Sequence, residues 1–222
     1  MTDVATPGLR ERKKVKTRAA IRAEALRLFK KHGFAATTVE QIAAATEISP
    51  STFFRYFPTK ESVLVENQYP AEIVRAFVAQ PDTVGLVDAM QAAVTQTFQA
   101  LSAAELDALH QRNRLIMATA ELRAAYMEHL YGLMTAISEA AAKRAGLEPD
   151  SLEIRTFAWL MQGALTAAST EWTENRSSSA ATIIDAFDRA FAVVRNGGTP
   201  PERAASGVTA KSSPRRRRSP AR

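Results

Sequence analysis

Apolar residues recur at the three- and four-residue spacing of amphipathic helices along most of this chain. Near the start, Ile21, Ala25 and Phe29 would share one face of a helix over residues 17–32, which Gly33 ends. The alternating pattern of a half-buried strand is absent from the sequence, and alanine is frequent. We therefore predict an all-α fold of about nine helices, with a three-helix N-terminal domain followed by a larger C-terminal helical bundle.

Two short helices are predicted after Gly33. Thr38 can cap the first, because Gln41 stands at the capping-box position three residues later. Ser49 can cap the second, with Pro50 at its first helical position, and Pro58 ends it. Two short helices joined by a tight turn form a helix-turn-helix, whose second helix can enter the major groove of DNA.

The second short helix carries side chains that commonly bind phosphates and base edges. These residues are Ser49, Ser51, Thr52, Arg55, Tyr56 and, at the start of the next helix, Lys60. Phe53 and Phe57 can hold the helix onto its own domain. On spacing alone, an ordinary pair of surface helices explains the pattern equally well.

Residues 17–64 contain a more specific set of positions. They are Gly33, Phe34, Thr37, Thr38, Val39, Ile42, Ala43, Ile48, Ser49, the run from Ser51 to Phe57, Lys60 and Glu61. This set resembles the DNA-binding domain of the TetR family of bacterial transcriptional regulators. The resemblance implies an all-helical homodimer with a variable C-terminal ligand domain.

The same resemblance assigns roles within this stretch. It implies operator contacts from Ser51, Thr52, Phe54, Arg55 and Tyr56, and phosphate contacts from Thr38 and Lys60. Two positions depart from the family pattern. Glu47 stands where glycine is usual, so we expect a different or slightly strained turn there. Phe54 replaces a tyrosine, so a contact through that hydroxyl is lost.

Charge is unevenly distributed over the 222 residues. The net charge is +6 over residues 1–58, −6 over residues 59–196 and +6 over residues 197–222. Basic ends and an acidic middle suggest that the ends meet a polyanion such as DNA.

From these patterns we divide the chain into four parts. They are a disordered basic arm (1–16), a helix-turn-helix domain (17–64), a helical ligand-binding and dimerisation domain (65–195) and a disordered basic tail (196–222). The fourth helix should start at Lys60 and be broken or kinked at Pro70. Further helices are expected near residues 84–101, 102–117, 121–145, 150–174 and 180–195.

Catalytic and metal-binding patterns are missing from the sequence. There is no cysteine, no glycine-rich phosphate loop and no GxSxG motif, and His32, His110 and His129 are far apart. We therefore predict no enzyme, no cofactor and no metal. No apolar run approaches the roughly 18 residues of a membrane helix, and the N-terminus is not a signal peptide, so we expect a cytoplasmic protein.

A small-molecule pocket among the middle helices is suggested by methionines and aromatic residues on inward faces, with a few polar groups. The candidate lining residues are Met90, Phe98, His110, Arg114, Met117, Tyr126, Met127, Trp159 and Gln162, with Asn113 and His129 as further polar candidates. The same residues could simply form a packed core.

The segment from His110 to Met127 resembles the C-terminal domain of TetR-type regulators that respond to acyl-CoA-like ligands. This resemblance implies an elongated apolar ligand, whose anionic end would suit Arg112 or Arg114.

The last two long helices present apolar stripes with small residues, which would suit a four-helix homodimer interface. The stripe residues are Phe157, Leu160, Ala164, Leu165 and Ala168, followed by Ile183, Ile184, Phe187, Phe191 and Val194. Burial within one protomer is the alternative.

Together these patterns predict a ligand-responsive transcriptional regulator. Its expected form is a repressor that binds a palindromic operator as a dimer and is released by a small apolar or amphipathic ligand. The alternative is a lipid-like ligand-binding protein without specific DNA binding.

Overall fold

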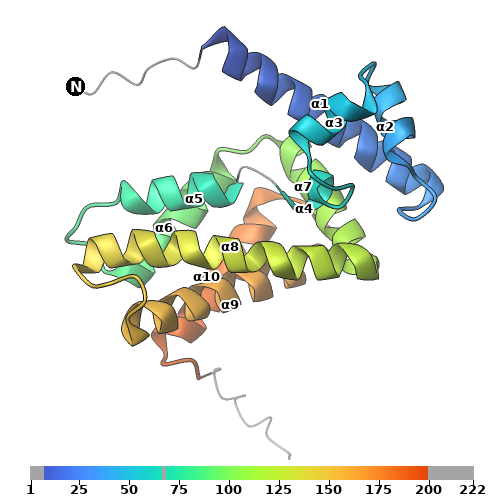
Figure 1. The fold of residues 1–222 in the computed structure, drawn as a ribbon. Coiled ribbons are helices and arrows are strands. Elements are labelled where there is room, and N and C mark those ends of the chain that lie inside the picture. The colour runs from blue at the N-terminus through green and yellow to red at the C-terminus, as the bar shows by residue number, and fades with distance from the viewer. Residues whose placement is uncertain (1–7, 67–68, 200–222) are drawn as a thin grey trace, which may run out of the picture.

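The computed structural model describes residues 8–66 and 69–199 and is helical throughout its regular elements (Figure 1). Ten helices and no strand lie within those ranges, which confirms the predicted all-α class. In Figure 1 the first helices lie together at one end of the molecule, and the later ones form a bundle beside them.

The N-terminal helices are α1 (Leu9–His32), α2 (Val39–Ala45), α3 (Pro50–Tyr56) and α4 (Ser62–Val65). They enclose an apolar cluster in which Ile21, Ile42, Phe53 and Phe57 are fully buried. This cluster also contains Ile116 and Leu122, so residues of the C-terminal part help to close the N-terminal core.

The predicted caps of α2 and α3 are present. Thr38 Oγ1 accepts a hydrogen bond from Gln41 N at 3.3 Å, and Thr38 N donates to Gln41 Oε1 at 3.0 Å, which completes the capping box. Ser49 Oγ accepts from Thr52 N at 3.1 Å, with Pro50 in the first turn of α3. The local sequence therefore fixes where both short helices begin.

The first helix is longer than predicted, since α1 begins at Leu9 rather than at Thr17. Disorder was expected as far as Lys16, whereas residues 9–16 form the first two turns of α1. The reason lies in their composition, because arginine, lysine and glutamate are good helix formers and residues 9–16 contain no proline or glycine. The part of the predicted arm before Gly8 lies outside the described residues.

The single fourth helix predicted from sequence corresponds to two helices in the structure. Helix α4 ends at Val65, and α5 (Tyr69–Val78) begins as a separate helix. Pro70 is therefore the second residue of a new helix and not a kink in a longer one. This placement costs little, because the N–H groups of a first helical turn have no partner within the helix.

The C-terminal helices are α6 (Leu86–Gln99), α7 (Ala103–Ala118), α8 (Ala120–Ala145), α9 (Leu152–Glu174) and α10 (Ala180–Arg195). Their shared core includes Phe77, Met90, Trp172 and Phe191. Ser102 and Ser179 cap α7 and α10, so both helices begin close to the starts predicted from sequence. Ser151 caps α9, which begins at Leu152, two residues after the start predicted from sequence.

Candidate DNA-reading face and effector cavity

Helix α3 is held by one side and presents the other to solvent. Phe53 and Phe57 are fully buried, with ring centroids 5.9 Å apart. Ser51 and Arg55 are exposed on the opposite side, and Phe54 is 51% exposed. We call the outward side of α3 the reading face. It contains hydrogen-bond donors and acceptors together with one aromatic ring.

The remaining predicted contact residues lie around this face. Thr38 and Ser49 are exposed at the starts of α2 and α3, while Thr52 and Tyr56 are half-buried. Ser49 Oγ lies 2.9 Å from both Ser51 Oγ and Thr52 Oγ1. The hydroxyl groups at the start of α3 thus form one connected cluster at the solvent boundary.

The turn before α3 adopts the unusual backbone that Glu47 suggested. Glu47 has φ = +54°, and it is the only residue other than glycine with positive φ in the described ranges. Its N–H donates to Ala44 O at 3.2 Å, and Ile48 N donates to Ala43 O at 3.0 Å. A side chain in the left-handed region is strained, so this turn has a conformation that glycine would adopt more easily.

Lys60 has a structural role that the sequence did not reveal. Its Nζ donates hydrogen bonds to the backbone oxygens of Phe34 at 2.9 Å and Thr37 at 3.1 Å, and lies 4.1 Å from the centre of the Phe34 ring. Two of its three N–H groups therefore hold the loop between α1 and α2.

The C-terminal end of α3 is fixed to α1. Arg18 Nη1 donates to Tyr56 O at 2.7 Å, and Arg18 Nη2 forms an ion pair with Glu66 Oε2 at 2.8 Å. The Arg18 guanidinium also lies 4.4 Å from the centre of the Phe57 ring. These contacts fix the orientation of the reading face relative to α1 and to the end of α4.

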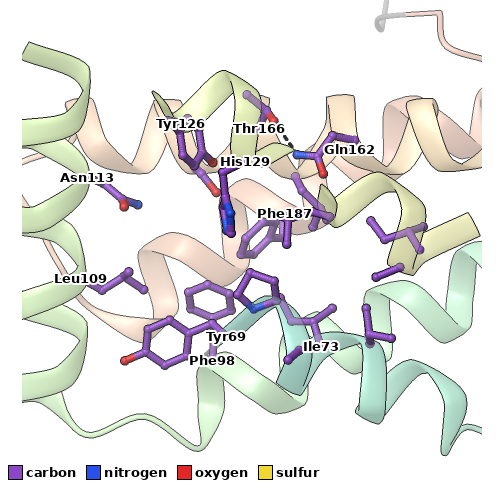
Figure 2. A pocket seen from close by; sticks show the side chains of 18 of the residues that line it. Tyr69, Ile73, Phe98, Leu109, Asn113, Tyr126, His129, Gln162, Thr166 and Phe187 are labelled. Carbon is purple, nitrogen blue, oxygen red and sulfur yellow. Dashed lines mark hydrogen bonds between the residues drawn. The ribbon is translucent and has the colours of Figure 1, made fainter. Parts of the chain in front are cut away.

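A cavity of about 320 Å³ lies within the C-terminal helices, between α5, α7, α8 and α9, and we call it the bundle cavity. Its apolar lining includes Ile73, Phe98, Leu109, Leu133, Ile137 and Phe187. Figure 2 shows several of these side chains around the cavity together with a small polar group. A mostly apolar cavity with few polar groups is the usual form of a small-molecule site.

Most of the polar lining comes from α7, α8 and α9, and Tyr69 of α5 adds one hydroxyl group. Gln162 Nε2 donates to Thr166 Oγ1 at 3.0 Å, as Figure 2 shows. The Nε2 atom of His129 is buried without a hydrogen-bond partner within the described structure. Burial lowers the pKa of His129, with the nearby Arg112 acting in the same direction and Glu66 opposing it. Burial also raises the pKa of Tyr126.

Arg112 lines the same cavity and is only 5% exposed. Its Nη2 donates to Val65 O at 3.0 Å, its Nε donates to Leu64 O, and its Nη1 donates to Asn113 Oδ1 at 2.8 Å. Burial lowers its pKa to about 10, which still leaves the guanidinium charged at neutral pH.

A second hollow, of about 630 Å³, lies between α1 and helices α5 and α7, and we call it the interdomain cleft. Its charged lining consists of Arg18, Arg22, Arg75, Arg112, Glu72 and Glu105. Tyr69, Leu109 and Arg112 line both the cleft and the bundle cavity. The two spaces therefore adjoin at Arg112.

Comparison with known families covers both parts of the chain. Residues 21–66 match the family described as "Bacterial regulatory proteins, tetR family", and residues 84–198 match the one described as "MftR C-terminal domain". The chain belongs to the TetR family. It is a ligand-responsive, DNA-binding transcriptional regulator of this family, as the sequence resemblance implied.

Individual TetR-family relatives are similar over most of their length. The transcriptional regulator TcmR of Streptomyces glaucescens is 30% identical over 197 residues, which cover 85% of this chain and 87% of TcmR. MftR of Mycobacterium tuberculosis is 30% identical over 175 residues, covering 78% of this chain and 86% of MftR.

Among solved structures, the transcriptional regulator FadR from Bacillus subtilis in complex with stearoyl-CoA superposes with a TM-score of 0.51. The identity is 16%, and the match covers 81% of this chain and 98% of the FadR chain. This likeness shows a shared fold.

The structure separates the nine predicted pocket residues into two groups. Phe98, Tyr126 and Gln162 line the bundle cavity, as do Asn113 and His129. The other six lie elsewhere: Met90, His110, Arg114, Met117, Met127 and Trp159. Helical spacing identifies the inner face of a helix, but it does not distinguish a cavity wall from packed core.

Two of these six residues are buried in the packing of the helices. Met90 is fully enclosed in the C-terminal core. His110 Nε2 lies 3.1 Å from both Trp172 O and Asn175 O, and its ring meets the Trp172 ring edge to face at 4.9 Å. His110 therefore holds the end of α9.

The other four lie nearer the surface. Arg114 is exposed on α7, and Met117 packs on the N-terminal cluster. Met127 and Trp159 are 57% and 52% exposed on the outer sides of α8 and α9. These positions point away from the bundle cavity.

Several lining residues were not predicted, among them Tyr69, Pro70, Thr166 and Ser169. From sequence, Pro70 indicates only a break or kink in a helix. The spacing of Gln162 and Thr166, four residues apart on one helix face, was the available signal for a polar pair.

The predicted dimer stripes are largely buried within the protomer. Ala168 of α9 and Phe187 of α10 belong to the C-terminal core, and Ala164 of α9 is also buried. Leu160 is the exception, being 48% exposed. The outward side of α9 instead presents Leu152, Trp159, Leu160, Gly163 and Ala167.

Two kinds of site are absent from the part of the chain that the structure describes. No group of three or more His, Asp or Glu side chains there could hold a metal ion. Among the helices of the same part of the chain, none has the length and apolar character needed to span a membrane.

Proposed function

We propose that this TetR-family regulator is a repressor that binds a palindromic operator as a homodimer and releases it when an apolar or amphipathic effector enters the bundle cavity. The observation that carries the proposal is the orientation of α3. Phe53 and Phe57 are buried while Ser51 and Arg55 face solvent, so the reading face is free to enter a major groove.

Within this proposal, Arg55 and Ser51 contact base edges, and Thr38 and Ser49 contact phosphates near the groove. Lys60 would add a phosphate contact through its third N–H group, since two are already used within the domain. Thr52, Phe54 and Tyr56 complete the contact set. We assign DNA binding to residues 17–64 and effector binding and dimerisation to residues 65–195. Operator binding implies a cytoplasmic protein.

For the dimer we propose the outward side of α9. Trp159 and Leu160 supply exposed apolar area there, and Gly163 and Ala167 allow a second helix to approach closely. On this side Tyr131 of α8 meets Trp159 edge to face at 5.9 Å, which extends the apolar surface. The outward side of α10 is more charged, since Arg189 pairs there with Glu171 and Asp185.

For the effector, the size and lining of the bundle cavity favour an apolar body with one polar end. An acyl-CoA-like compound is a candidate, and a TetR-fold protein, FadR from Bacillus subtilis, has been solved with stearoyl-CoA. The alternative function, sequestration of a lipid-like ligand without DNA binding, would use the same cavity.

A gel shift with DNA flanking the protein's own gene separates the two functions. A repressor should retard this DNA in the presence of excess unrelated DNA, and light scattering should give the mass of a dimer. Ligand binding without any preference for the flanking DNA would support the sequestration function instead.

A further inference from the structure

The C-terminal end of α4 is stabilised by arginines from both halves of the molecule. The last carbonyl groups of a helix have no partner within that helix. Arg22 of α1 donates to Val63 O at 3.1 Å and to Glu66 O at 2.8 Å. Arg112 of α7 donates to the two carbonyls between them, those of Leu64 and Val65. Helix α4 is thus connected to the effector domain through Arg112.

The charge of Arg112 has no carboxylate partner among the ion pairs of the described residues. Its three hydrogen bonds go to neutral oxygens, those of Leu64, Val65 and the Asn113 side chain. A guanidinium has five N–H groups, so two remain for another acceptor. A buried cation without a counter-charge is costly, and an anion would remove much of that cost.

The position of Arg112 also suits an amphipathic ligand. On one side lies the bundle cavity, whose lining is mostly apolar, and on the other lies the interdomain cleft. The 320 Å³ of the cavity corresponds to about ten methylene-sized groups, if each fills roughly the 30 Å³ of one water molecule. A chain of that length would bring its polar end to Arg112.

We propose that the effector is an apolar chain of about ten carbon atoms with an anionic end, and that Arg112 binds this anion with its two remaining N–H groups, which draws the guanidinium away from the carbonyls of Leu64 and Val65. This inference rests on the proposed function and adds the ligand class and the coupling residue. The anion would weaken the connection between α7 and the end of α4. Since Arg22 and Arg18 link that end to α1 and α3, the reading faces would lose their DNA-binding arrangement.

The anionic end could belong to a free carboxylate or to a CoA thioester, and these two groups would occupy different places. A free carboxylate would be enclosed at Arg112. The nucleotide of a CoA thioester is too large for the remaining cavity and would have to occupy the interdomain cleft, where Arg18, Arg22 and Arg75 are available.

Calorimetric titration with decanoate, decanoyl-CoA and 1-decanol tests the proposal. The wild-type protein should bind at least one of the two anionic compounds ten-fold or more tightly than the alcohol, and which one binds identifies the source. Arg112→Met should reduce this preference to less than three-fold while alcohol binding is kept. Arg114→Met is the matched control, because Arg114 is exposed on the same helix, and it should behave as wild type.

The wild-type comparison does not depend on the folding of any variant. Equal binding of acid and alcohol, or binding of none of the three compounds, would overturn the proposal, as would a preference that survives in a folded Arg112→Met protein. Operator DNA provides the second arm: the preferred anion should lower operator affinity at least ten-fold and saturating 1-decanol less than three-fold. If the anion leaves operator affinity unchanged, the proposed coupling is overturned. If the protein prefers the anion through Arg112 but binds no operator, the proposed function is refuted.

Discussion

Lys60 donates a hydrogen bond from Nζ to the backbone oxygen of Thr37, 3.1 Å away. Thr37 is almost fully buried and precedes the cap of α2, so this bond joins the start of the helix-turn-helix to the loop before α4. A residue assigned from sequence to phosphate binding thus also stabilises the domain that presents it.

We predict that Lys60→Met lowers the free energy of unfolding by about 1–2 kcal/mol, because two carbonyl groups lose a charged donor. The methionine keeps the apolar stem, so packing against Phe34 is largely retained. Arg55→Ala is the control and should change stability by less than about 0.5 kcal/mol, since Arg55 is exposed. Urea unfolding measures both, and equal stability of the two variants would contradict the structural role of Lys60.

The turn at Glu47 predicts a substitution that raises stability instead of lowering it. Glu47→Gly should raise the free energy of unfolding by about 0.5–1 kcal/mol, because glycine adopts φ = +54° without strain. Glu47→Ala removes the same carboxylate but keeps the strained backbone, so it should give no such gain. Thermal unfolding of both variants makes the comparison. Equal melting temperatures would assign any effect to the charge.

Arg144 shows how burial determines the contribution of an arginine. Its guanidinium donates to the backbone oxygens of Gln80 at 2.6 Å, Pro81 at 2.9 Å and Val84 at 3.1 Å, and its side chain is 5% exposed. Asp82 lies 3.9 Å away but is 95% exposed.

We predict that Arg144→Met costs about 2–4 kcal/mol, because the loop between α5 and α6 loses several hydrogen bonds at once. Asp82→Ala should cost less than about 0.5 kcal/mol, since an exposed partner adds little. Chemical denaturation distinguishes them. A larger loss for Asp82→Ala than for Arg144→Met would show that the ion pair, and not the carbonyl contacts, holds the loop.

The lowered pKa of His129 predicts a pH dependence of stability. Burial disfavours its charged form in the folded protein, so below its ordinary pKa of 6.5 the unfolded chain binds more protons. The wild-type protein should therefore lose stability relative to His129→Gln as the pH falls from 7 to 5.5. Taking the difference in unfolding free energy between the two proteins removes the contribution of the other titrating groups. Parallel stability curves over this range would mean that His129 is not desolvated.

Local chemistry made much of the fold predictable. Caps such as Thr38 and Ser49 determine helix starts through neighbouring atoms, and these starts appear where the sequence analysis predicts them. The break after Val65 was not predictable in the same way. The end of α4 depends on guanidinium groups from Arg22 and Arg112, which are distant in sequence.

The cavity was harder to predict than the helices. Met90 and Phe98 both lie on the inner side of α6, yet only Phe98 lines the cavity. Arg112 and Arg114 were equivalent candidates from sequence, and the rotation of α7 buries the first and exposes the second. Whether an inward side chain meets empty space depends on the packing of several helices together, which helical periodicity does not encode.

The central claim is that the reading face of α3 recognises a specific operator, and selection of binding sites from a random DNA pool tests it most directly. The wild-type protein should enrich an inverted repeat whose half-sites are about 34–36 Å apart, or a multiple of this spacing, and Arg55→Ala should relax the base preference in each half-site. Enrichment of no sequence by the wild-type dimer, or an unchanged preference in Arg55→Ala, would contradict the account.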